Sequence, residues 1–409
     1  MELACRACGT SGLEIVLSLG EMPLSNSLLT KDQLDDPESR YPLDLALCQT
    51  CGLAQITVAL DPIELFDEYA YFSSYSSTML AHAEGLVQRM IEERGLGPES
   101  LAMEVASNDG YLLQYYLRSG VPVLGIDPAR NVVVAAQERG VETLCSFFGA
   151  ELAEELRASG RRASVLHANN VLAHVPDVNG VLHGIGHVLA DDGVAVIETP
   201  YVRDLIERLE FDTIYHEHLF YYSLTALDRL FERNGVRIVD VERIPIHGGS
   251  LRVLAAPAET APTADPSVGC LLEEEENLGI TTLEYFKGFA DRVDGLRERL
   301  LALLGALKDQ GHRIAAYGAA AKGAVLLNAF DIGTEEIDFV ADRSEYKQGR
   351  FMPGVHIPVV TPDSILAEMP DEVLLLAWNF AGEILEQQAE YRSRGGRFII
   401  PAPIPEVIV

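Results

Sequence analysis

The sequence predicts an α/β protein with a doubly wound parallel sheet at its centre, a small cysteine-rich subdomain before it and a second α/β unit after it. Short apolar runs alternate with helical patterns through the middle of the 409-residue chain, which is typical of such a sheet. The same alternation returns toward the end of the chain. Four of the six cysteines lie apart from both regions, at or before position 51.

The charge balance limits the classes of partner. The chain carries 31 Lys and Arg against 62 Asp and Glu, a formal net charge of −31. Binding to DNA or RNA depends on basic residues that neutralise phosphates, so we expect no nucleic-acid partner. No apolar run is long enough to span a bilayer, and the N-terminus has no signal-peptide core. We therefore expect a cytoplasmic protein with no membrane partner, while its oligomeric state stays open.

Three parts are expected along the chain: residues 1–65, 66–280 and 281–409. The first part is rich in turn residues and short strands. In the middle part, the apolar runs predict strands at Leu101–Val105, Pro122–Ile126, Ser164–Ala168, Gly193–Glu198, Val236–Ile244 and Ser250–Ala255. Helices are predicted at Tyr111–Ser119, Ala129–Arg139 and Val178–Val188. The segment Val241–Ala256 is interpreted as an antiparallel hairpin.

A connection leads from the middle part to the last. It begins with a Pro-, Ala- and Thr-rich stretch at 257–275 and includes the acidic run Glu273–Glu276, interpreted as the solvated start of a helix. A helix near Thr282–Gln310 follows. The last part then predicts a second α/β unit, with strands at Arg313–Tyr317, Ile337–Ala341, Val373–Leu376 and Arg397–Ile400 and a helix at Ala320–Ala329.

The cysteine pattern predicts a structural zinc site. Cys5 and Cys8 form one CxxC pair, Cys48 and Cys51 form another, and a glycine follows each pair. Two such turns supply the four sulfurs of a tetrahedral Zn²⁺ centre, and four cysteine ligands leave no open position for chemistry. The alternative is a set of redox-active or idle thiols.

A strand, tight turn and helix near residue 104 predict a nucleotide-type cofactor site. The turn Ser107–Gly110 has one glycine where the dinucleotide motif GxGxxG has three, which favours a cofactor without phosphates, and S-adenosylmethionine fits. Asp127, at the end of the next strand, lies 23 residues after Glu104, a spacing suited to a ribose diol. Another nucleotide, or a turn with no ligand, remains an alternative. The candidate cofactor-binding residues are Tyr75, Glu104, Ser107, Asn108, Asp109, Gly110, Asp127, Asn169 and Asn170.

A histidine and tyrosine cluster at 214–222 is the strongest candidate for acid–base chemistry. Tyrosine can donate a hydrogen bond to a developing oxyanion, and histidine can accept a proton near neutral pH. His216 and Glu217 are expected to point in opposite directions, and the alternative is an aromatic loop that only packs between domains. Outside this cluster, His174 follows a strand end where ligands bind, and Tyr71 precedes the cofactor fold.

The last part contains a candidate phosphate site. Arg313–Gly323 predicts a strand, a small-residue turn and a helix start, where Lys322 adds a positive charge. We expect Lys322 to bind the phosphate end of a sugar nucleotide, the alternative being a unit used only for shape. His247, in a hairpin turn, is a candidate substrate contact.

Six motifs taken together resemble a known family. After the CxxC pairs come VASNDGY at 105–111, NNVLAHVPD at 169–177, YHEH at 215–218, HGGS at 247–250 and YGAAAKG at 317–323. This order resembles that of the S-adenosylmethionine-dependent sugar C-methyltransferases of antibiotic biosynthesis, over nearly the whole chain. The resemblance implies a zinc-binding domain, a central class I methyltransferase domain and a C-terminal Rossmann-like domain. It also implies C-3 methylation of a dTDP-linked 4-keto-2,6-dideoxyhexose.

The resemblance also implies residue roles. His218 is the implied base at C-3, with Glu217 beside it, while Tyr215, His174 and a tyrosine of 69–75, here taken as Tyr71, surround the keto oxygen and reacting carbon. Two other functions fit the sequence less well. An NAD-dependent nucleotide-sugar dehydrogenase or epimerase is disfavoured because GxGxxG is missing, and a zinc-ribbon regulator of nucleic acids is disfavoured by the acidic charge.

Overall fold

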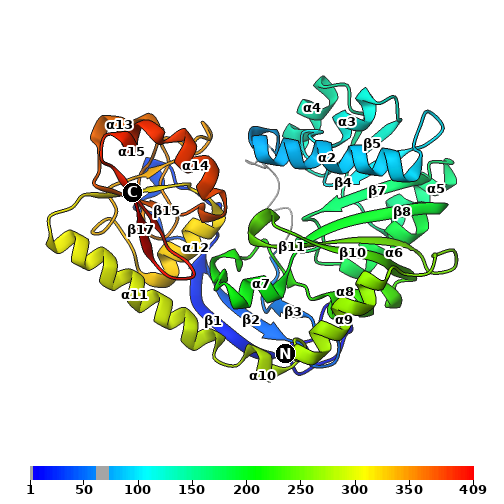
Figure 1. Cartoon of the computed structure of the whole chain (residues 1–409), viewed down its shortest axis with the longest axis horizontal. Helices are drawn as coiled ribbons and strands as arrows, with labels where there is room; N and C mark the ends of the chain where they lie inside the picture. Colours follow the sequence, from blue (N-terminus) through cyan, green and yellow to red (C-terminus); the bar gives the residue numbers. More distant parts are fainter. Residues whose placement is uncertain (1–2, 61–72) are drawn as a thin grey trace.

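The computed structural model describes residues 3–60 and 73–409 and gives the backbone, without the side chain, at His247. In this part of the chain the strands form three sheets, and the N-terminal sheet lies between the other two (Figure 1). The predicted α/β class is confirmed. Among the described residues, no helix combines the length and apolarity needed to cross a membrane.

The central sheet has the strand order β10-β11-β8-β7-β4-β5-β6. Its parallel core and its antiparallel hairpin β10–β11 agree with the prediction, and β6 is an additional short strand. Its strands are β4 (Ala102–Val105), β5 (Val123–Asp127), β6 (Thr143–Cys145), β7 (Ala163–Asn169), β8 (Leu189–Pro200), β10 (Val236–Ile244) and β11 (Ser250–Pro257).

Helices cover both faces of this sheet through apolar stripes. On one face, Leu86 of α2 and Tyr116 of α3 pack against Val165 and Val196 of the strands. On the other face, α5 and α6 pack against the same strands. The helices associated with the sheet are α2 (Ser77–Arg94), α3 (Leu113–Arg118), α4 (Arg130–Glu138), α5 (Ala150–Ala158), α6 (Val178–Val188), α7 (Val202–Glu207) and α8 (Leu224–Arg233).

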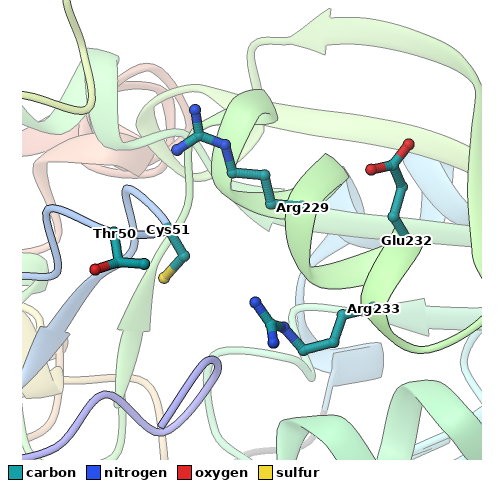
Figure 2. A pocket seen from close by; sticks show the side chains of 5 residues that line it. All are labelled: Thr50, Cys51, Arg229, Glu232 and Arg233. Atoms are coloured by element: carbon teal, nitrogen blue, oxygen red, sulfur yellow. The ribbon is translucent and has the colours of Figure 1, made fainter. Parts of the chain in front are cut away.

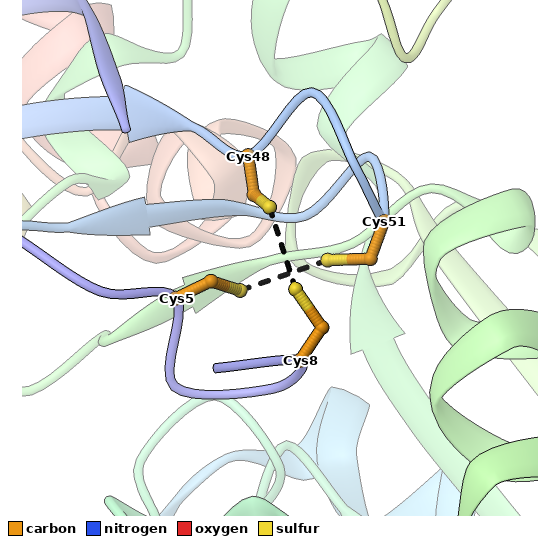
Figure 3. Close-up of side chains that lie close together, drawn as sticks. All are labelled: Cys5, Cys8, Cys48 and Cys51. Carbon is orange, nitrogen blue, oxygen red and sulfur yellow. Dashed lines mark hydrogen bonds between the residues drawn. The ribbon is translucent and has the colours of Figure 1, made fainter. Parts of the chain in front are cut away.

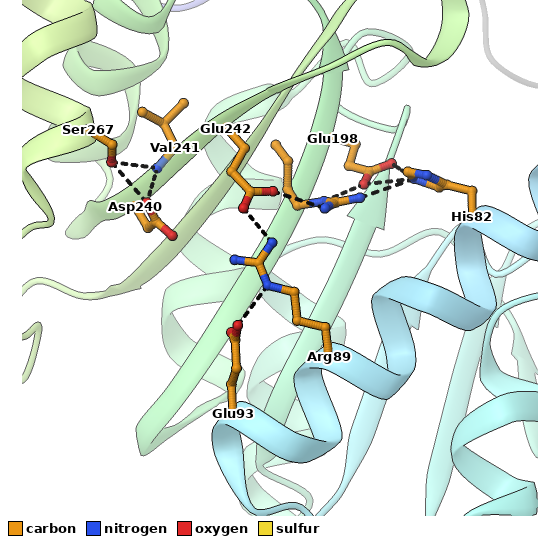
Figure 4. Close-up of polar contacts among 9 residues, drawn as sticks. His82, Arg89, Glu93, Glu198, Asp240, Val241, Glu242 and Ser267 are labelled. Atoms are coloured by element: carbon orange, nitrogen blue, oxygen red, sulfur yellow. Dashed lines mark hydrogen bonds and ion pairs between the residues drawn. The ribbon is translucent and has the colours of Figure 1, made fainter.

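A buried ionic network fixes α2 across the strands (Figure 4). The Glu198 carboxylate, 1% exposed, accepts from Arg252 Nε at 2.7 Å and lies 2.9 Å from His82 Nε2 on α2. The Arg252 guanidinium also forms an ion pair with Glu242, and Glu242 forms a second ion pair with Arg89 of α2. Because charge partners surround the buried carboxylate, its pKa is lowered although burial acts in the opposite direction.

The N-terminal sheet contains a strand from a distant part of the chain. Its order is β1-β2-β3-β9, where β1 (Glu14–Pro23), β2 (Arg40–Leu47) and β3 (Ala54–Ile56) come from the first sixty residues. The fourth strand, β9 (Phe220–Tyr221), follows the histidine and tyrosine cluster directly. The cluster is therefore held between the central and the N-terminal sheets.

The C-terminal sheet has the order β14-β13-β12-β15-β16-β17 and is parallel except for β17. β12 lies between β13 and β15, so the strand order reverses there, a place where open α/β sheets bind ligands. Its strands are β12 (Ile314–Tyr317), β13 (Val340–Ala341), β14 (Val359–Val360), β15 (Glu372–Leu375), β16 (Arg397–Ile400) and β17 (Glu406–Ile408). The helices of this unit are α11 (Phe289–Asp309), α12 (Ala321–Phe330), α13 (Asp363–Glu368), α14 (Ala381–Gln387) and α15 (Ala389–Ser393).

Two details of the connection differ from the sequence prediction. The acidic run is not a solvated helix start: it lies in the second half of α9 (Pro266–Leu278), and Glu275 is fully buried. Glu275 accepts hydrogen bonds from Tyr201 Oη and from the backbone at the start of α8. The helix predicted near Thr282–Gln310 is broken into α10 (Leu283–Phe286) and α11 by Gly288, whose φ of +74° is left-handed.

Candidate functional site

One cavity of about 770 Å³ is lined by residues from all three parts of the chain. The central sheet contributes its cofactor-type loops, the cluster before β9 contributes Tyr215, Glu217 and His218, and the C-terminal unit contributes Lys322 and Lys347. We call it the central cavity. The cluster therefore borders an open space as well as the neighbouring domains.

The loop after β4 has an unusual backbone where it borders the central cavity. Ala106, Asn108 and Gly110 have φ values of 52°, 49° and 76°, and the first two are rare for residues with a side chain. The Asn108 side-chain oxygen stabilises the turn by accepting from the backbone N–H groups of Ser73 and Asp109, each at 3.0 Å. Such strain is found mostly at functional sites, where the surrounding structure maintains it.

Asp127 ends β5 on the wall of the cavity. Its two carboxylate oxygens accept from the backbone N–H groups of Asn108 and Ala129, both at 2.9 Å. Burial raises the pKa of Asp127 to about 6, so the carboxylate is still mostly ionised at neutral pH. Asn169 and Asn170 also line the cavity, and their side-chain oxygens have no hydrogen-bond partner among the described residues. These polar groups fit the ribose and amino acid tail of S-adenosylmethionine.

Four other predicted cofactor residues lie behind this wall. Glu104 and Ser107 are buried, and burial together with nearby carboxylates raises the pKa of Glu104 well above its ordinary value. Asp109 pairs with Arg139 at 2.6 Å, and Gly110 has a left-handed φ and packs against Val141. None of the four is among the residues that line the central cavity.

Of the predicted Tyr71, Tyr75 and His247, the structure describes only the side chain of Tyr75. Tyr75 is 58% exposed and is not among the residues lining the cavity. Tyr71, and Tyr69 with it, lies outside the described residues. His247 belongs to the short turn Ile246–Gly248 next to β11, where only its backbone is described.

Hydrogen bonds fix the protonation pattern of His218. Its Nδ1 lies 3.1 Å from the backbone carbonyl oxygen of Thr213, and since a carbonyl can only accept, Nδ1 carries the proton. Nε2 of the neutral ring then has the lone pair, and the Tyr215 hydroxyl donates to it at 2.8 Å. His174 meets the His218 ring edge to face, with ring centroids 4.7 Å apart. The geometry thus leaves one basic nitrogen facing a tyrosine hydroxyl.

The two other ionisable groups of the cluster differ from ordinary surface residues. Burial lowers the pKa of His174 to about 4, so its ring is neutral at pH 7. Burial raises the pKa of Glu217 to about 7, although two contacts from Asn26 Nδ2, at 2.7 and 2.8 Å, and the charge of Lys347 act in the opposite direction. As expected, His216 points away, toward the Pro42 carbonyl oxygen at 3.3 Å.

Sequence reasoning missed several residues of the cavity. Asn26 comes from the N-terminal part, and Lys347 donates to the Ala319 carbonyl in the C-terminal unit. Their positions carry no motif, because only the folded chain brings them to the cluster. The missed lining residues with polar or aromatic side chains include Asn26, Phe147, Phe148, Lys347 and Phe380.

The four cysteines converge as predicted (Figure 3). The Sγ atoms of Cys5 and Cys51 are 3.6 Å apart, as are those of Cys8 and Cys48, and all four lie within 4.8 Å of one another. A tetrahedron with Zn–S bonds of about 2.3 Å requires about 3.8 Å between sulfurs. The two turns repeat the same bond: the glycine N–H after each pair donates to the first cysteine carbonyl at 2.8 Å. The cluster therefore fits structural zinc.

A second hollow, of about 420 Å³, borders this cluster (Figure 2). It is lined by Thr50 and Cys51 of the second turn and by Arg229, Glu232 and Arg233 of α8. Four thiolates around Zn²⁺ keep two negative charges, so the arginines supply a favourable field beside the centre.

Three family models match consecutive parts of the chain. They are described as "Putative zinc binding domain" (residues 5–66), "Methyltransferase domain" (79–241) and "C-methyltransferase C-terminal domain" (245–403). The four cysteines fall in the first and the cofactor-type loops in the second. Fold, site and models together define a methyltransferase with an added zinc-binding domain.

The relatives narrow this class. The chain is 39% identical to the C-methyltransferase NovU of Streptomyces niveus over 404 residues, which cover 99% of this chain and 96% of NovU. It therefore belongs to the family of S-adenosylmethionine-dependent C-methyltransferases, and the dehydrogenase or epimerase alternative finds no support. Ubiquinone biosynthesis O-methyltransferase of Azorhizobium caulinodans is 30% identical over 98 residues, 24% of this chain and 39% of that protein.

Solved structures give more distant matches. Magnesium protoporphyrin IX methyltransferase of Synechocystis PCC 6803 is 14% identical, with a TM-score of 0.34, over 43% of this chain and 78% of that chain. A protein of Pyrococcus horikoshii is 14% identical, with a TM-score of 0.38, over 49% of this chain and 100% of that one.

Proposed function

We propose that this enzyme methylates C-3 of a dTDP-linked 4-keto-2,6-dideoxyhexose, using His218 as the base that forms the enolate. The observation that carries the proposal is the shared cavity, which is lined by His218, by Asp127 with its polar neighbours, and by Lys322 and Lys347. Base, methyl-donor site and anion site are thus within reach of one substrate.

His218 is suited to remove a proton from carbon next to a ketone. Its Nδ1–H is held by the Thr213 carbonyl, so the ring cannot turn without losing that bond, and Nε2 keeps its lone pair toward Tyr215. When the ketosugar enters, the Tyr215 hydroxyl can change its acceptor from Nε2 to the keto oxygen. That change frees the base and provides a donor to the developing enolate.

His174 supports the same charge development. Its pKa of about 4 keeps the ring neutral, so it can offer a hydrogen bond near the enolate without competing with His218 for the proton. Bound S-adenosylmethionine supplies an electrophilic methyl group for the enolate carbon. Asp127, Asn169 and Asn170 would hold its ribose and amino acid tail, and Phe147 and Phe148 offer apolar surface for its adenine.

The nucleotide end of the substrate is assigned to the C-terminal unit. Lys322 and Lys347 are the cationic side chains among the described residues that line the cavity, and a diphosphate needs such charges. Both lie near the strand-order reversal at β12. Asn379 and Phe380, after β15, add an amide and an aromatic ring suited to a nucleobase.

The test follows the reacting carbon. The enzyme is incubated in D₂O with the dTDP-linked ketosugar, first without and then with methyl-labelled S-adenosylmethionine. We expect deuterium at C-3 in the first case and labelled methyl at C-3 in the second, and His218→Asn should abolish both. Exchange that persists in His218→Asn would assign the base elsewhere, and methyl label on a sugar oxygen would refute carbon methylation.

A further inference from the structure

A short turn of the methyltransferase domain is docked on the C-terminal unit. This turn, η3 (Phe211–Thr213), lies just before the catalytic cluster. The Phe211 ring stacks on Phe330 of α12, with centroids 4.8 Å apart and planes at 21°. The indole N–H of Trp378, after β15, donates to the Asp212 carboxylate at 2.7 Å. Apolar packing and a charge-assisted hydrogen bond thus fix η3 to the same unit.

The Asp212 anchor is buried and has a cation near it. Asp212 is 1% exposed, and the opposite charge of Lys322 acts on it. The Lys322 ammonium itself lies over the Trp378 ring, 4.5 Å from its centroid. A buried carboxylate loses much of its solvation, so the Trp378 hydrogen bond matters more here than on a surface. Neither Asp212 nor Trp378 is among the residues that line the central cavity.

The next residue connects this anchor to the base. The Thr213 carbonyl follows Asp212 directly and accepts from Nδ1 of His218 at 3.1 Å. Tyr221 Oη reaches the same carbonyl only at 3.4 Å. The position of this carbonyl determines which nitrogen of His218 carries the proton and where Nε2 points. Any displacement of η3 would therefore move this carbonyl and change the tautomer and the orientation of His218.

We propose that Asp212 and Trp378 are positioning residues for His218, so that the C-terminal unit holds the catalytic base in its working tautomer through η3. This inference rests on the proposed role of His218. It assigns the C-terminal unit a part in proton removal in addition to binding the sugar nucleotide.

The test compares Trp378→Phe, Asp212→Ala and their double variant in the full-length enzyme. Trp378→Phe removes the indole N–H donor and keeps a smaller aromatic ring beside Lys322. In each of these variants we expect the rate of C-3 deuterium exchange at saturating sugar nucleotide to fall about tenfold or more, because a hydrogen bond to a buried charge is lost. The KM for the sugar nucleotide should stay within about twofold of the native value. The double variant should fall no further than Asp212→Ala, because both changes remove one interaction. Asp212→Asn, which keeps an acceptor oxygen, should restore most of the rate.

A matched control separates positioning from general loss of structure. Tyr391, fully buried in the C-terminal unit, donates to the Pro370 carbonyl at 2.9 Å, and Tyr391→Phe should leave exchange unchanged. The ¹⁵N shifts of labelled His218 report the tautomer even in a weakly folded variant: Nδ1–H should dominate in the native enzyme and a mixture should appear in Trp378→Phe. An unchanged exchange rate and tautomer in Trp378→Phe, or a rise in KM alone, would overturn the inference.

The failure of the proposed function would look different. If His218→Asn keeps exchange, the proposed base is wrong, and with it this inference. If His218→Asn loses exchange while Trp378→Phe and Asp212→Ala match the native rate, the base stands and only the positioning role falls.

Discussion

The Tyr215 hydroxyl has two proposed roles, and Tyr215→Phe distinguishes them by magnitude. In the free enzyme the hydroxyl donates to His218 Nε2 at 2.8 Å, whereas in the reaction it would donate to the enolate oxygen. The phenylalanine ring keeps its place beside the His218 ring, whose centroid lies 4.0 Å from that of Tyr215. His218 also keeps its bond from Nδ1 to Thr213, so the base stays oriented.

The two roles predict different losses. A neutral hydrogen bond that only holds His218 contributes about 0.5–1.5 kcal/mol, a rate loss of about 2- to 12-fold. A donor aimed at a developing oxyanion contributes about 2.7–4 kcal/mol, or about 10²- to 10³-fold. If the hydroxyl merely occupied the lone pair of Nε2, its removal would instead speed proton transfer.

We expect the larger loss, measured as C-3 deuterium exchange at saturating ketosugar without the methyl donor. The exchange assay isolates enolate formation from methyl transfer. A decrease smaller than about tenfold, or an increase, would refute the role of Tyr215 as a donor to the enolate.

Three further results are expected. Because burial raises the pKa of Glu217 to about 7, the folded state binds this proton more tightly than the unfolded chain, and stability is lost as pH rises from about 4.5 through 7. Glu217→Gln should therefore raise the free energy of unfolding at pH 8 more than at pH 5, by up to about 3 kcal/mol, and equal changes at the two pH values would count against it. Cys48→Ser should lose bound zinc and unfold at lower temperature, whereas Cys145→Ser, outside the cluster, should keep about one zinc per chain. Asp127→Asn should weaken S-adenosylmethionine binding in calorimetry about tenfold and leave dTDP binding unchanged, whereas equal weakening of both ligands would contradict the assignment.

Features set by local sequence were predicted well. Each CxxC pair with its glycine forms one turn whatever surrounds it, so the zinc cluster could be derived from spacing alone. The strands of the central sheet follow from apolar runs that need burial on both faces. The YHEH motif also indicated Tyr215 and His218, which both line the central cavity.

Features set by tertiary contacts could not be predicted. Glu104 fits the spacing of a cofactor residue, but side chains alternate along a strand, and its neighbour Val105 faces the cavity instead. Asn26 lies 191 positions from the Glu217 that it contacts, and no local pattern reports such a pair. In the sequence, Glu275 cannot be told apart from the other three glutamates of the run Glu273–Glu276. It is buried only because α9 packs on α8.

The placement of β9 connects the N-terminal sheet, and with it the zinc cluster, to the loop that carries the proposed base. Leu219, between His218 and β9, links two structural elements: its N–H donates to Ala173 in the central domain, and its carbonyl accepts from Ile56 of β3. Cys51 lies only a few residues before β3 in the chain. Removal of the metal would thus loosen the N-terminal support of the loop that carries the proposed base, so we expect an enzyme stripped of its zinc to lose turnover before its adenosyl-binding domain unfolds.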